Sequence, residues 1–123
     1  MPNPPRLNLP ERTHGLISAT RKFLTEANHS RHEGPHTALS SLGQPTRATD
    51  PDACKWCLIG ALTYVNTNQP FALEVIREAM LRVRAAMPRK YATIAEMNSK
   101  QELHRTKQVL ELVERRLEEE LAE

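Results

Sequence analysis

Two cysteines and three upstream histidines are the residues of this chain whose types and spacing could do the most chemistry. The cysteines form the motif Cys54-Lys-Trp-Cys57, and His29, His32 and His36 precede them in a polar stretch. Thiolate sulfur and imidazole nitrogen can together hold a tetrahedral zinc ion if that stretch folds over the cysteines. The alternative is that both cysteines are small apolar residues of a core helix. Because histidine precedes cysteine, unlike the common zinc-finger order, we expect no metal and no cofactor.

Catalysis through the same cysteines is a second alternative, because a thiol at a helix N-terminus has a lowered pKa. A thioredoxin-type CxxC needs a strand and helix around it, and no such alternation is visible in the sequence. Asp50 and Asp52 are the only aspartates, and both are explained as residues that begin a helix. The chain has no glycine-rich phosphate loop, no HExxH and no GxSxG. We therefore expect a protein that is not an enzyme.

Charged side chains form two further sets that could bind a partner. The basic set is Arg77 and Arg84, which are seven residues apart on one helix face, with Arg89 and Lys90 just beyond. The acidic set lies on the last predicted helix and consists of Glu111, Glu114, Glu118 and Glu119. The basic set could mimic a cationic ligand or approach a bound nucleic acid, and the acidic set could occupy a groove meant for phosphate. Either set would speed association at low salt.

The elements that must position these residues belong to a single domain, since the chain has 123 residues, of which 39% are hydrophobic. Residues 1–9 contain three prolines and predict a flexible arm, and residues 10–123 predict one helical domain. The longest apolar stretch, 56–65, is half of the roughly 20 residues that a membrane-spanning helix needs. No apolar secretory signal follows Met1, so we expect a cytoplasmic protein with no membrane partner.

Apolar residues recur at spacings of three and four, which is typical of amphipathic helices. Four main helices are predicted, over residues 11–28, 51–65, 70–87 and 100–121. Short helices are expected at 35–42 and 91–97, and Ser99 with Glu102 predicts a capping box at the start of the last main helix. No segment alternates with a period of two, so the predicted fold is all-α. It is a compact bundle of four main helices plus short helices, with the apolar helix at 51–65 in its centre.

The core of this bundle is predicted from the apolar faces of its helices. The residues expected to be largely buried are Trp56, Leu58, Leu62, Ile76, Met80, Leu110 and Val113. The apolar face of the last helix could pack internally or pair with a second copy of the chain. The protein is therefore expected to be a monomer or a homodimer formed through the last helix.

Three short stretches carry a resemblance to a known family: residues 56–62, with the sequence WCLIGAL, Met97-Asn98, and Val109-Leu110. They resemble a family of small uncharacterised bacterial and phage helical proteins with a WCxxGAL-type central helix and an Asn-containing turn. That turn is commonly Asn-Asp in the family, whereas here Ser99 follows Asn98, which removes a carboxylate. The resemblance implies a phage or mobile-element setting and no known activity. In such settings, small proteins that block host machinery include the anti-CRISPR proteins.

These observations favour a small non-enzymatic protein that acts by protein–protein interaction with a larger complex, and that could be an anti-defence inhibitor. The basic and acidic sets are its candidate contacts. The alternative is a small nucleic-acid-binding regulator that uses the basic set directly, since phosphate binding needs several cations on one surface. The net charge of +2 is too small to imply a nucleic-acid partner by itself. A zinc-binding or cysteine-dependent module comes third.

Overall fold

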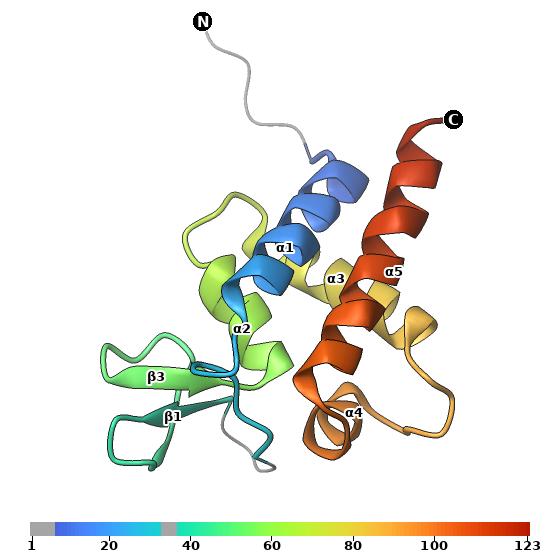
Figure 1. Ribbon diagram of the computed structural model, residues 1–123. Coiled ribbons are helices and arrows are strands. Elements are labelled where there is room, and N and C mark those ends of the chain that lie inside the picture. Colours follow the sequence, from blue (N-terminus) through green and yellow to red (C-terminus); the bar gives the residue numbers. More distant parts are fainter. Residues whose placement is uncertain (1–6, 33–36) are drawn as a thin grey trace, which may run out of the picture.

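The computed structural model describes residues 7–32 and 37–123, which form five helices and a small three-stranded antiparallel sheet (Figure 1). The helices are α1 (Leu9–Phe23), α2 (Leu58–Val65), α3 (Ala72–Ala86), α4 (Ile94–Lys100) and α5 (Leu103–Leu121). The strands are β1 (Ala38–Ser40), β2 (Pro45–Thr46) and β3 (Ala53–Trp56), in the order β2-β1-β3. The mostly helical prediction is confirmed, but the all-α class is wrong because of this sheet. The predicted arm at 1–9 falls mainly on residues outside the described ones.

The predicted central helix at 51–65 is a helix only in its second half. Asp50 closes a turn, since its side-chain oxygen accepts a hydrogen bond from the amide of Asp52 at 2.8 Å, and a strand follows instead of a helix. The strand is held on both sides, because β1 pairs with β3 and Trp56 exchanges backbone hydrogen bonds with Asn28 and Ser30. The helix α2 begins after Cys57, whose sulfur accepts a hydrogen bond from the amide of Gly60. Long-range strand pairing therefore overrides the local helix signal.

The short helix predicted at 35–42 is wrong in its described part, which is the strand β1 and the turn that joins it to β2. The amide of Gly43 donates to the carbonyl of Ser40 at 2.9 Å, and Gly43 has a φ of +78° that favours glycine. Leu42 is 85% exposed at the tip of this turn. The proline that would begin the helix, Pro35, lies outside the described residues.

The ends of the later helices also differ from the prediction. Ser99 does not cap α5, since it lies within α4, and Glu102 occupies the N-cap position of α5. The capping pattern belongs instead to Thr93 and Glu96 at the start of α4. Thr93 Oγ1 accepts from the Glu96 amide at 3.1 Å, and the Glu96 carboxylate accepts from the Ala92 amide at 3.3 Å.

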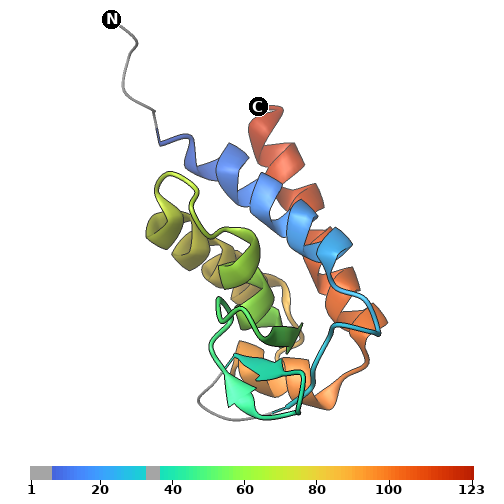
Figure 2. The same cartoon turned by 90° about the vertical axis from the view of Figure 1, so that its left-hand side faces the viewer.

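The core lies where α1 packs along α5 and against α3, with α2 beneath α1 and the sheet at one end (Figures 1 and 2). Of the predicted core, five residues are buried and two are half-buried on α3. The buried ones are Trp56, Leu58, Leu62, Leu110 and Val113. The half-buried ones are Ile76 and Met80, because α3 turns Val75, Ala79 and Val83 inward instead. This rotation of α3 decides which of its side chains face solvent.

Candidate functional site

The outer face of α3 carries apolar and basic side chains in alternation. Leu73, Arg77, Leu81 and Arg84 follow one another at intervals of four, four and three residues, so they lie on one side of the helix. Leu73 is 56% exposed and Leu81 is 63% exposed. Exposed apolar side chains that adjoin one another and are rimmed by charged ones are typical of an interaction site.

Two adjoining hollows lie along this stripe. The first, of about 330 Å³, is lined by Arg77, Met80, Leu81, Arg84 and Ile94. The second, of about 360 Å³, continues from Arg84 past the end of α3 to Arg89 and Tyr91. We call this surface the α3 face, defined by Arg77, Met80, Leu81, Arg84, Arg89, Lys90, Tyr91 and Ile94. Arg77, Arg84 and Arg89 of the predicted basic set line these hollows, and the ammonium of Lys90 lies 5.2 Å from the centroid of the Tyr91 ring.

The arginines of the α3 face have no partner within the described part of the chain. None of Arg77, Arg84 and Arg89 makes a side-chain hydrogen bond or an ion pair with a described residue. Arg82, on the inner flank of the same helix, is bound by the carboxylates of Glu78 and Glu120 at 3.2 and 2.6 Å. Those bonds, above all the one to Glu120, raise the pKa of Arg82. The helix therefore neutralises one arginine internally and leaves the others available to bind an anionic group.

The acidic set does not form one available surface. Glu114 is buried and makes a two-bond ion pair with Arg21 of α1, with oxygen–nitrogen distances of 2.6 and 3.2 Å. Glu118 lies 3.0 Å from His14 Nε2, whereas Glu111 and Glu119 are exposed. Glu114 therefore contributes to packing of α1 on α5 and is removed from the candidate contacts.

The described cysteines and histidines do not form a metal-binding group. Cys54 is exposed on β3, and His32 is hydrogen-bonded to the hydroxyl of Ser30 at 2.6 Å. Cys57 is half-buried, and its burial raises the pKa of its thiol. In the part of the chain that the structure describes, no three His, Cys, Asp or Glu side chains are grouped to hold a metal ion. His36 lies outside that part.

Asn98 lies at the centre of a buried polar cluster that the sequence pattern did not predict. Asn98 Oδ1 accepts hydrogen bonds from His29 Nε2 at 2.7 Å and from the Leu58 amide at 3.0 Å, and its Nδ2 donates to the Ser30 carbonyl at 3.0 Å. Burial lowers the pKa of His29. The two stretches at 56–62 and 97–98 that carry the family resemblance meet here. The cluster joins three segments of the core.

Comparison with protein family models, with characterised proteins and with solved structures finds no match. Among residues 7–32 and 37–123, none of the helices has the length and hydropathy needed to cross a membrane. On the α3 face, exposed apolar side chains lie beside arginines that form no ion pair with a described residue.

Proposed function

We propose that this protein is a non-enzymatic binding protein whose α3 face binds an acidic surface of another protein, within a larger macromolecular complex. One observation carries the proposal: Arg77 and Arg84 line an apolar hollow, Arg89 lines the hollow that adjoins it, and none of these arginines forms an ion pair with a described residue. Arginine is enriched among the residues that dominate binding energy between proteins, and arginine and methionine are both enriched in protein interfaces.

The apolar lining favours a protein over a nucleic acid as the partner. Met80, Leu81 and Ile94 offer no hydrogen bond to a base edge or a phosphate. The only ring on this face is Tyr91, which is half-buried and has the ammonium of Lys90 5.2 Å from its centroid. Single-stranded nucleic acids are usually held by several stacked aromatic rings in a basic groove. A small nucleic-acid-binding regulator is therefore the second candidate, supported by the four clustered cations.

A single copy of the chain suffices for this proposal. The leucines of the last helix that could have formed a dimer seam are buried inside the fold, since Leu103, Leu110 and Leu117 are each 5% exposed or less. We therefore favour a monomer over a homodimer through α5. The finer proposal of a phage anti-defence inhibitor, similar in action to anti-CRISPR proteins, has the family resemblance as its only support.

The experiment is a pull-down from bacterial lysate with tagged protein, with and without nuclease treatment. We expect a protein partner that survives nuclease and is lost with the variant Leu81→Asn, which removes the exposed apolar side chain. Leu42→Asn is the matched control, because Leu42 is 85% exposed on the distant β1–β2 turn. If every partner disappears after nuclease, and binding to free DNA or RNA falls steeply as salt rises, the second candidate replaces the first.

A further inference from the structure

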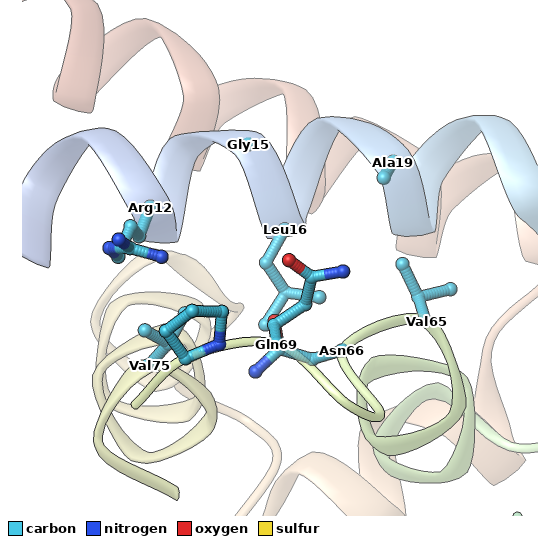
Figure 3. A pocket seen from close by; sticks show the side chains of 9 residues that line it. Arg12, Gly15, Leu16, Ala19, Val65, Asn66, Gln69 and Val75 are labelled. Atoms are coloured by element: carbon cyan, nitrogen blue, oxygen red, sulfur yellow. The ribbon is translucent and has the colours of Figure 1, made fainter. Parts of the chain in front are cut away.

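The helix α3 carries apolar side chains on two opposite sides, and the fold covers one of them. On the inner side, Val75, Ala79 and Val83 are buried. In Figure 3, Leu16 projects from α1 and Val75 lies on the opposite side of the hollow that both residues line, so α1 covers this side of α3. On the outer side, Leu81 is 63% exposed. A helix that is apolar on two sides normally packs against neighbours on both.

The outer side of α3 has the shape that a second helix requires. Its exposed and half-buried side chains form two adjacent rows, each with a spacing of four residues. The first row is Leu73, Arg77 and Leu81, and the second row is Ile76, Met80 and Arg84. Helices pack by placing a row of side chains into the groove between two such rows of their neighbour. The hollow of about 330 Å³ is lined by members of both rows and by Ile94 of α4.

The main chain of α3 favours a helix over an extended segment in this groove. Met80 and Leu81 lie in the middle of α3, where the backbone amides and carbonyls are bonded within the helix. An extended segment that crossed these apolar side chains would bury its own amides and carbonyls without hydrogen-bond partners. Extended peptides usually bind at a sheet edge or, when they are rich in proline, in an aromatic groove. An α-helix satisfies its own backbone groups, so it can bury a row of apolar side chains here without this penalty.

The charges around the groove favour acidic residues on the bound helix. Among the described residues that line the two hollows of the α3 face, the charged ones are Arg77, Arg84 and Arg89, and none is acidic. None of these arginines forms an ion pair with a described residue. Arg77 and Arg84 are seven residues apart, which is about 10 Å along the helix axis. Carboxylates about two turns apart on a helix that runs nearly along α3 can therefore bind both arginines.

We propose that the α3 face binds an amphipathic α-helix of the partner protein. The apolar side chains of this helix recur at spacings of three and four residues and fill the groove, and its carboxylates bind Arg77, Arg84 and Arg89. This inference rests on the proposed function, and it adds the conformation and the side-chain pattern of the segment that the α3 face recognises.

The test is a selection from a phage-displayed library of random peptides of about 16 residues, which is long enough for about four helical turns. The full chain is the immobilised bait. We expect the enriched peptides to share apolar residues at spacings of three and four, with aspartate or glutamate beside them. The tightest of them, made as a synthetic peptide, should gain helical circular dichroism when it binds.

Two proline substitutions in the synthetic peptide test its conformation. A proline at the centre should weaken binding at least about tenfold, because it breaks the helix. A proline at the first residue of the helix, where proline is tolerated, should leave the affinity within about twofold.

Two variants of the chain locate the binding site. Leu81→Asn should weaken binding of the synthetic peptide at least about tenfold, because it places an amide in the apolar groove. Leu42→Asn is the same substitution at an exposed position of the β1–β2 turn, and it should leave the affinity within about twofold.

The outcomes separate this inference from the proposed function. Acidic peptides that need Leu81 but lack helical spacing, or that tolerate the central proline, would overturn the bound helix and leave the proposed function standing. Enriched basic peptides would contradict both. If no peptide is enriched, or if the peptides bind Leu81→Asn as tightly as the wild type, the bound helix is overturned, and the pull-down decides the proposed function separately.

Discussion

His29 Nε2 donates a hydrogen bond to Asn98 Oδ1 at 2.7 Å, across 69 positions of the sequence. The same oxygen accepts from the amide of Leu58, the first residue of α2, so a side chain of α4 satisfies a helix N-terminus from a distance. The amide nitrogen of Asn98 binds the carbonyl of Ser30. One side chain thus fixes the segment before the sheet, the start of α2 and the position of α4.

Replacing Asn98 should therefore destabilise the whole domain. Asn98→Ala leaves the Leu58 amide, the Ser30 carbonyl and His29 without their buried partner, and we expect it to lower the free energy of unfolding by about 3 kcal/mol. Urea denaturation followed by circular dichroism measures this. Ser99→Ala, at the adjacent half-buried position, should cost less than about 1 kcal/mol. Equal effects of the two substitutions would show that the cluster is not a structural centre.

Because His29 is buried in this cluster, the free energy of unfolding should depend on pH. Burial lowers the pKa of His29 from the ordinary value of 6.5, an effect that the bond to Asn98 and the charge of Glu26 oppose and that Arg31 and His32 reinforce. Well above pH 6.5 both folded and unfolded His29 are neutral, so its contribution to stability is complete. As the pH falls from 6.5 towards the lowered pKa, only the unfolded chain binds the proton, and the free energy of unfolding decreases.

The measurement is the urea midpoint from pH 7.5 down to pH 5. His29→Gln should flatten the part of the decrease that begins near pH 6.5, although it lowers stability overall. A variant that keeps the full pH dependence of the wild type would exclude His29 as its source.

The ion pair between Arg21 and Glu114 should hold α1 against α5. Glu114→Gln keeps the shape of the side chain and removes its charge, so Arg21 loses a charge-assisted bond with an Nε–Oε1 distance of 2.6 Å. We expect a loss of about 1–2 kcal/mol in the free energy of unfolding, measured with urea. Glu119→Gln, on the exposed side of the same helix, should change it by less than about 0.5 kcal/mol. If Glu114→Gln is as neutral as this control, the pair does not stabilise the fold.

The two thiols should react at very different rates. Cys54 is exposed, whereas Cys57 is half-buried with a raised pKa, which its bond from the Gly60 amide only partly opposes. With Ellman's reagent at pH 8 we expect one fast thiol and a second that is slower by about tenfold or more. Cys54→Ser should remove the fast phase, and Cys57→Ser should retain it. A fast phase that survives Cys54→Ser would mean that Cys57 is an activated nucleophile.

The sequence predicts those parts of the fold that depend on local periodicity. The apolar spacing at 70–87 and 100–121 locates α3 (Ala72–Ala86) and α5 (Leu103–Leu121) to within three residues at each end. Residues 53–56 could not be placed in this way, because their strand is created by pairing with β1 and with the segment around Asn28. Aspartate and proline, the types of Asp50 and Pro51, are found in turns as well as at helix starts. A short apolar run does not distinguish a strand from a helix.

The candidate site, like the fold, is predicted by the sequence only where it depends on local spacing. The interval of seven residues places Arg77 and Arg84 on one face of a helix whatever that helix contacts. Ile94 lines the first hollow and Tyr91 lines the second. Both positions depend on how α4 and the segment before it pack against α3, and no local sequence pattern predicts this packing. The pairing of Glu114 with Arg21 likewise depends on the docking of α1 on α5, so Glu114 could not be separated from its exposed neighbours by sequence alone.

The most direct test of the α3 face is the affinity of the double variant Arg77→Glu, Arg84→Glu for the captured protein partner, measured by isothermal titration. Arg47→Glu, an exposed charge reversal beyond β2, is the matched control. We predict that the double variant, while folded by circular dichroism, binds at least about tenfold more weakly than the wild type, and that Arg47→Glu stays within about twofold. Wild-type affinity in the folded double variant would contradict the account.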